Sequence, residues 1–121
     1  IYAHDVTLGA SEVIQRALRD CPFATAMIIH NDAAVVGAPQ AFERMGVHVP
    51  EDLSVVTIVP EQLGEGMQIP FDSVRVDVDM VASRTVDRLI ARIGNPDAPT
   101  TVELLDQPLN IQGSVRALHV G

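Results

Sequence analysis

The chain has 121 residues, of which 47% are apolar and only 3% aromatic, and it carries a net charge of −8. That length allows one compact domain, whose core must be filled mainly by aliphatic side chains. The acidic charge argues against direct binding to nucleic acid, and no apolar run approaches the roughly 20 residues that a membrane-spanning helix needs.

The sequence of the first half of the chain predicts two helices with a buried strand between them. Residues 7–20 carry alanine, isoleucine and leucine at helical spacing, and the apolar run Thr25–Ile29 is typical of a strand inside a sheet. A second helix is expected to begin at Asp32, whose carboxylate can cap the free amides of the first turn. It should end at Met45, before Gly46.

The second half predicts further strands and one long helix. Leu53–Val59 is another apolar run, and residues 77–93 give the clearest helical pattern, with Asp77 as the N-cap. The weaker candidates are a helical turn at 61–66 and strands at 73–76, 101–105 and 109–114. Alternation of strands and helices at this spacing indicates right-handed βαβ units. The predicted fold class is α/β, a three-layer parallel sheet flanked by helices.

Polar residues follow the two clearest strands at their carboxyl ends, where parallel sheets bind ligands. Asn31 and Asp32 follow the first strand, and Glu61 comes two residues after Val59, at the end of the second. Asn31 offers both a donor and an acceptor, which suits a hydroxylated or amide-bearing small molecule. The alternative is that Asn31 and Asp32 only begin the helix, and the sequence leaves both interpretations open.

The sequence contains no constellation that predicts catalysis, a metal site or a cofactor. Its four histidines form no HxxxH or HExxH pair, its serines lie outside a nucleophile elbow, and its glycines form no phosphate-binding loop. The single cysteine, Cys21, cannot form an internal disulfide, and the first residues lack signal-peptide features, which together favour a cytoplasmic protein. An α/β enzyme stays an alternative, weakened by the missing catalytic groups.

Nearly the whole chain resembles one known family. Residues Thr25–Val59 resemble a segment of LacI/GalR-type bacterial transcriptional regulators. They read TAMIIHNDAAVVGAPQAFERMGVHVPEDLSVVTIV, and the resemblance is clearest in the HND and VPEDLSVV motifs. IPFDSVRVD and LNIQGS are similar to later motifs of the family. The resemblance implies a type I periplasmic binding protein-like fold. Residues 1–121 would be its C-terminal subdomain, without the N-terminal subdomain and the DNA-binding helix-turn-helix.

The resemblance also implies where an effector would bind. In the family a small molecule, often a sugar, lies between the two subdomains, and the asparagine that corresponds to Asn31 commonly contacts it. His4 falls at a position often held by an aromatic residue, from which it could stack on the ligand or bond to it. Val59 replaces a frequent acceptor aspartate, which argues against an ordinary sugar, and Glu61 could substitute for that carboxylate.

Regulators of this family are homodimers, and the resemblance places the contact on the helix after HND and on the short helix after the second strand. Here these surfaces include Ala33, Val36, Leu63 and Met67. The helix that begins near residue 33 is apolar nearly all round, which an isologous contact would explain. Burial of this helix within its own domain is the alternative.

The predicted function is therefore the effector-binding and dimerisation part of a regulator that contacts DNA only through an absent N-terminal domain. The alternative is half of a periplasmic-type sugar-binding protein of a transporter, which shares the fold. The VPEDLSVV motif favours the regulator, because solute-binding relatives seldom carry such a segment at this place.

Overall fold

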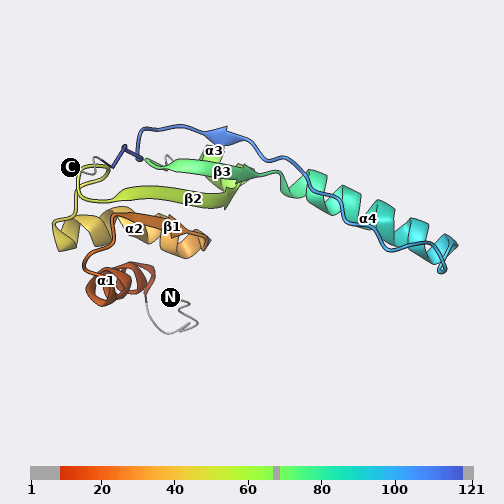
Figure 1. Cartoon of the computed structure of the whole chain (residues 1–121), viewed down its shortest axis with the longest axis horizontal. Coiled ribbons are helices and arrows are strands. Elements are labelled where there is room, and N and C mark those ends of the chain that lie inside the picture. The colour runs from red at the N-terminus through yellow and green to blue at the C-terminus, as the bar shows by residue number, and fades with distance from the viewer. Residues whose placement is uncertain (1–8, 67–68, 119–121) are drawn as a thin grey trace.

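The computed structural model describes residues 9–66 and 69–118. Within these ranges, helices and strands alternate along most of the chain (Figure 1). In chain order they are α1 (Ala10–Asp20), β1 (Ala26–Ile29), α2 (Asp32–Met45), β2 (Ser54–Pro60), α3 (Glu61–Gly66), β3 (Asp72–Val76), α4 (Val78–Gly94) and β4 (Leu109–Asn110). The helices and the first three strands lie where hydrophobic periodicity predicts them.

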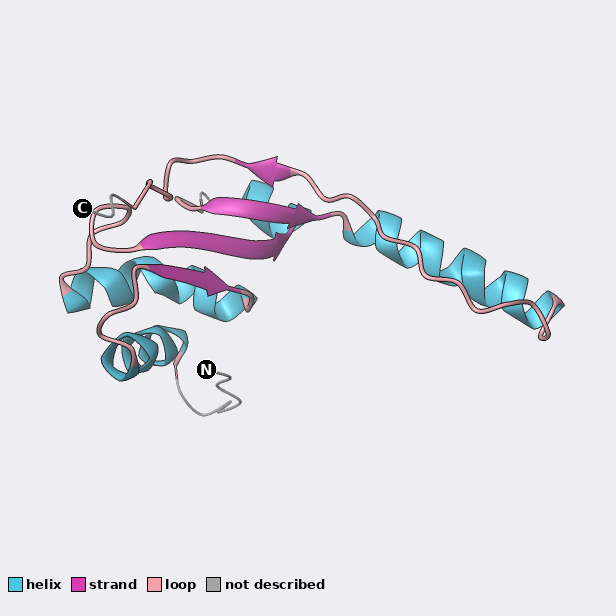
Figure 2. Ribbon diagram, in the orientation of Figure 1, coloured by secondary structure: helices cyan, strands magenta, loops and turns pink. Residues whose placement is uncertain are grey.

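The strands form one open sheet in the order β1-β2-β3-β4. β1, β2 and β3 are parallel, with Ile29 opposite Thr57 and Thr57 opposite Ser73 (Figure 2). β4 is antiparallel to β3, because the chain runs back beside α4 before it reaches the sheet. The predicted α/β class, an open sheet flanked by helices, is confirmed, but the sheet is mixed rather than wholly parallel.

Alternation along β2 gives the sheet a covered face and an open face. Val55, Thr57 and Val59 are buried on the side of α1 and α2, and the residues between them point to the opposite side. On the covered side Phe42 packs edge-on against Phe71, with the ring centroids 5.9 Å apart. The hydrophobic core therefore lies between these helices and one face of the sheet.

The two ends of α2 follow ordinary capping chemistry. The N-cap is Asn31 rather than Asp32: the Asn31 Oδ1 accepts a hydrogen bond from the amide of Ala34 at 3.0 Å, and Asp32 is the first helical residue. Asn31 takes this role because its backbone is extended, as an N-cap requires. At the other end Gly46 adopts a φ of 65°, which confirms the predicted C-terminal glycine.

The long helix α4 differs from the predicted third layer. It follows β3 after a single residue, Asp77, and projects away from the other helices (Figure 1). Asp77 caps it as predicted, with the carboxylate accepting from the amide of Met80 at 2.8 Å. No residue of α4 is buried. Periodicity identifies the helix, but its position depends on the direction in which the chain leaves β3.

The segment after α4 also departs from prediction. Residues 101–105 form no strand but run back beside α4 (Figure 1). Glu103 pairs there with Arg88 at 2.9 Å and with Arg84 at 3.7 Å. The predicted strand at 109–114 shortens to β4, because the amides that follow it bind a side chain rather than a neighbouring strand.

That side chain is the buried carboxylate of Asp72, which fastens the tail to the sheet. Its Oδ1 accepts hydrogen bonds from the amides of Gln112, Gly113 and Ser114 at 2.6, 2.7 and 3.3 Å. The Ser114 hydroxyl accepts from the Asp72 amide and donates to the carbonyl of Val55. The amide bonds, that from Gln112 above all, hold the pKa of Asp72 below its usual 3.8, although burial opposes them.

Candidate functional site

Asn31 lies at the carboxyl end of β1 and lines a cavity between β1 and α1. The cavity has a volume of about 520 Å³, within the range of small-molecule sites. Its walls are mainly apolar and come from Val13, Ile14 and Ala17 of α1 and from Met27, Ile28 and Ile29 of β1. His30 and Asn31 supply the polar groups of the lining.

The side chain of Asn31 has two ends with separate tasks. Its Oδ1 accepts from the amide of Ala34 and so begins α2, while its Nδ2 donates to no residue in the described part of the chain. Asn31 is exposed to solvent. The two interpretations that the sequence leaves open are therefore compatible, since a residue that caps the helix still has a donor for a ligand oxygen.

The other residues predicted to bind ligand lie elsewhere. Val59 is only 1% exposed and belongs to the core, because alternation along β2 places it on the covered face. Thr57, on the same face, is buried with its hydroxyl unpaired. Glu61 is partly exposed as the first residue of α3, beyond the carboxyl end of β2. His4 lies outside the described residues.

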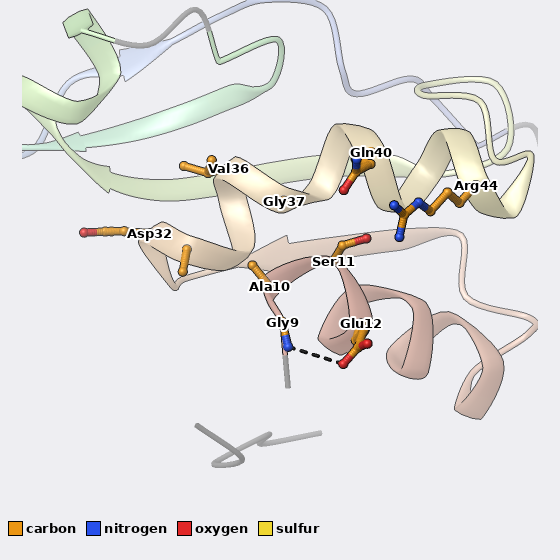
Figure 3. A pocket seen from close by; sticks show the side chains of 10 residues that line it. Gly9, Ala10, Ser11, Glu12, Asp32, Val36, Gly37, Gln40 and Arg44 are labelled. Atoms are coloured by element: carbon orange, nitrogen blue, oxygen red, sulfur yellow. Dashed lines mark hydrogen bonds between the residues drawn. The ribbon is translucent and has the colours of Figure 1, made fainter. Parts of the chain in front are cut away.

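The outer side of α2 forms a second hollow, the α1–α2 groove, of about 590 Å³ (Figure 3). Its wall on α2 consists of residues spaced along one side of the helix, and its other wall is the first turn of α1. The lining comprises Gly9, Ala10, Ser11, Glu12, Asp32, Ala33, Val36, Gly37, Gln40 and Arg44.

Two of the four predicted dimer residues meet in this groove. Ala33 and Val36 line it together, and Val36 is 47% exposed. Leu63 instead packs against the hydrophobic core, so part of its surface is already covered within the chain. Met67 lies outside the described residues. Sequence reasoning missed Gln40 and Arg44, although their spacing of four from Val36 places all three on one side of the helix.

Gly37 determines how closely α1 and α2 approach. A Cβ atom at this position would lie 2.8 Å from both the Cβ of Ala10 and the amide nitrogen of Ser11. The first turn of α1 therefore rests directly on the backbone of α2, as Figure 3 shows. A larger residue would push α1 outward and change the wall of the groove.

The groove combines an apolar floor with a polar rim. Ala33, Val36 and Gly37 provide the floor, and Asp32 and Arg44 place opposite charges toward its two ends (Figure 3). An open surface with an apolar centre and a polar margin is typical of contacts between proteins. The cavity beside β1 is therefore the better candidate for a small molecule, and the groove is the better candidate for a protein partner.

The described part of the chain offers little for other chemistry. No group of three or more histidine, cysteine or carboxylate side chains in it lies close enough to hold a metal ion. None of its helices combines the length and the apolar character that a membrane span requires.

A family model matches nearly the whole chain. Residues 2–115 match the model described as a periplasmic binding protein-like domain. Among curated proteins, the HTH-type transcriptional regulator MalR of Streptomyces coelicolor is 31% identical over 110 residues, which cover 89% of this chain and 31% of MalR. The chain spans only about a third of the length of the curated relatives that it matches.

Solved structures share the fold. A transcriptional regulator LacI from Bacillus cereus subsp. cytotoxis matches with a TM-score of 0.72 and 20% identity, over 92% of this chain and 41% of that one. A LacI family transcriptional regulator from Enterococcus faecium, solved with bound ribose, matches with a TM-score of 0.66 and 19% identity, over 92% and 41%. These relatives are regulators, which favours the predicted regulator over the transporter alternative.

Proposed function

This chain belongs to the periplasmic binding protein-like domain family in the form found in LacI-type regulators, and from that premise we propose that residues 1–121 are the C-terminal subdomain of a regulator's effector-binding unit. The observation that carries the proposal is the match of residues 2–115 to the family model. The DNA-binding part and the facing subdomain belong to segments outside this chain. Such a regulator acts in the cytoplasm as a binding protein and not as an enzyme.

The proposed effector is a small hydroxylated molecule, and a sugar is the first candidate. Asn31 contributes its free Nδ2 donor at the carboxyl end of β1, and the cavity beside it has the size of a small-molecule site. The bound ribose of the Enterococcus faecium regulator supports the choice of a sugar. His4 and Glu61 are proposed as further ligand contacts. Val59, the remaining predicted contact, is buried and would shape the site only from beneath.

The test separates the two tasks of Asn31 in the full-length regulator. Asn31→Ser keeps an oxygen that can cap α2 but removes the amide donor, whereas Asn31→Ala removes both. Isothermal titration with ribose and a panel of sugars and sugar acids should show weaker binding for both variants, by about tenfold or more, as expected for one lost hydrogen bond to a ligand. Wild-type affinity in Asn31→Ser would remove Asn31 from the site.

The proposed dimer contact is the α1–α2 groove with Ala33 and Val36. An apolar floor at the outer side of α2 suits an isologous contact, in which both protomers present the same groove. A charge at Val36 would then be buried between protomers without a partner. Light scattering of the full-length regulator should show loss of the dimer in Val36→Asp. The control is Phe23→Asp, which introduces the same charge at a side chain that is exposed outside the groove.

A further inference from the structure

The exposed side of α2 carries opposite charges at its two ends. Asp32 is the first residue of the helix and Arg44 is the last but one, and both line the α1–α2 groove with exposed side chains (Figure 3). At 1.5 Å per residue, the rise from Asp32 to Arg44 is about 18 Å, which is too far for the two side chains of one chain to pair. Within residues 9–66 and 69–118, neither side chain forms an ion pair.

One other charged side chain lines the groove, Glu12 of α1. Its carboxylate accepts from the amide of Gly9 at 3.3 Å and so belongs to the first turn of its own helix. It forms no ion pair with Arg44 in the described part of the chain. The groove therefore presents an anion at one end of α2 and a cation at the other, both exposed to a partner.

The residues between these charges are spaced evenly. Val36 follows Asp32 by about one turn, and Gln40 precedes Arg44 by about one turn. When a second copy is turned by half a revolution about an axis across the middle of α2, Asp32 comes to lie beside Arg44 of that copy. Val36 then comes to lie beside Gln40. The surface is therefore complementary to itself in this one orientation.

We propose that two copies pack α2 against α2 in antiparallel orientation, with Asp32 of each copy paired with Arg44 of the other. The inference rests on the proposed dimer contact through the groove and adds the orientation of the two helices and the residues that set it. A parallel contact would place Asp32 beside Asp32 and Arg44 beside Arg44, and like charges brought together in an interface are strongly unfavourable. The charges therefore select the antiparallel arrangement.

The course of α2 across the fold favours a second copy over the facing subdomain as the occupant of the groove. The helix begins at the carboxyl edge of the sheet, where Asn31 follows β1, and it ends at the opposite edge, where residues 46–53 lead into β2. A subdomain that faces the carboxyl edge reaches only the end of the groove that carries Asp32. An antiparallel copy covers the whole length and offers an opposite charge to both ends.

The same two charges also suit the ends of α2 in a single chain. An acid in the first turn and a base in the last turn complement the helix dipole. That effect stabilises the helix of each chain separately and does not depend on the charges of a partner. Chains with reversed charges therefore distinguish the dipole from the proposed pairs.

The first test is a cycle of charge reversals in the full-length regulator. Asp32→Lys and Arg44→Glu each create two like-charged pairs in an antiparallel dimer. The dimer dissociation constant, measured by sedimentation over a range of concentrations, should rise by about tenfold or more in either variant. The chain with both changes regains opposite charges and should return close to the wild type. The control Glu43→Lys changes an exposed charge of α2 outside the groove and should dimerise like the wild type.

The second test mixes the two single variants. In a dimer of one Asp32→Lys chain and one Arg44→Glu chain, each end of the contact pairs a cation with an anion. Native mass spectrometry of the equimolar mixture should therefore show clearly more heterodimer than random exchange gives. The dipole alone predicts random exchange. Random exchange, or single variants that dimerise as tightly as the wild type, overturns the antiparallel pairing.

Val36→Asp separates failure of the pairing from failure of the proposed contact. If Val36→Asp loses the dimer while the charge reversals leave it intact, the groove contact stands and the antiparallel pairing is wrong. If Val36→Asp keeps the dimer, the groove contact is wrong and the pairing falls with it. Circular dichroism checks that each variant is folded, so that a lost dimer reports on the contact.

Discussion

At the scale of single residues, Asn31 shows how one side chain serves both fold and site. Its Oδ1 caps α2 at 3.0 Å from the amide of Ala34, and its backbone is extended as an N-cap requires. Asparagine and aspartate cap helices almost equally well, so the sequence Asn31-Asp32 identifies the start of the helix but not which of the two residues caps it. Only the backbone conformation decides between them.

The cap has a measurable effect on stability. Asn31→Ala should lower the free energy of unfolding by about 1 kcal/mol, and Asn31→Ser by a few tenths at most, because serine also presents an oxygen to the first turn. Urea unfolding followed by circular dichroism measures both. Equal losses in the two variants would mean that the hydrogen bond to Ala34 does not stabilise α2.

The hydrogen bonds to the Asp72 carboxylate make the attachment of the tail to the sheet sensitive to acid. The folded-state pKa of this carboxylate lies below the usual 3.8, so its contribution to stability is complete well above that value and is lost as the pH falls through the lower folded pKa. Unfolding free energies from urea titrations should therefore decrease steeply below about pH 4. Asp72→Asn should have a lower unfolding free energy than the wild type at pH 6, and its unfolding free energy should decrease less steeply as the pH falls.

Asp52 provides a comparison for this titration. Hydrogen bonds from the His48 amide and ring also lower the pKa of Asp52, but this pair is exposed at the surface. Protonation of Asp52 therefore causes part of the decrease in unfolding free energy that the wild type shows at acid pH. That part should persist in Asp72→Asn. An unchanged slope in Asp72→Asn would show that the carboxylate of Asp72 does not control the attachment of the tail.

At the scale of elements, the close contact of α1 and α2 depends on Gly37. Gly37→Ala should destabilise the chain by about 1–3 kcal/mol, because the added methyl group meets backbone and Cβ atoms of α1 at 2.8 Å. Helix propensity alone would predict a gain of up to about 1 kcal/mol. Gly94→Ala is the control, since nothing lies within 4 Å of its added Cβ. Thermal or urea unfolding that ranks Gly37→Ala above the wild type would contradict the packing.

Elements with a strong local pattern were predictable, and those defined by distant partners were not. α4 is evident from its apolar spacing and from Asp77, and β1 and β2 from their apolar runs. Val102 and Leu104 alternate with polar residues as in a strand, yet they are exposed, because Arg84 and Arg88 hold Glu103 beside α4. Such a contact between segments far apart in sequence leaves no periodic signal.

The candidate site was predictable in the same uneven way. The resemblance of the HND motif pointed to Asn31, and the cavity beside β1 agrees with that position. Alternation within β2 already implied that Val55, Thr57 and Val59 share one face, but not that this face is the covered one. The groove residues Gln40 and Arg44 became visible only once α1 was placed against α2.

At the scale of the whole molecule, the sequence identifies apolar surfaces without saying what covers them. The stripe of α4 and the alternation of β2 both read as parts of a buried core, yet in the single chain they remain apart. The proposed dimer contact through the α1–α2 groove makes stability depend on protomer concentration. The melting temperature of the full-length regulator should therefore rise by several degrees over a hundredfold increase in concentration, and Val36→Asp should abolish that rise.

The attachment of the tail also sets the order in which the protein can fold as it is made. The hydrogen bond from Ser114 to Val55 joins residues 59 positions apart. The carboxylate of Asp72 accepts from amides that lie 40 to 42 residues further along the chain. A chain that lacks residues 112–114 therefore has β2 and β3 but none of the bonds that these residues make to Asp72 and Val55. This fastening of the sheet can form only after those residues have been made.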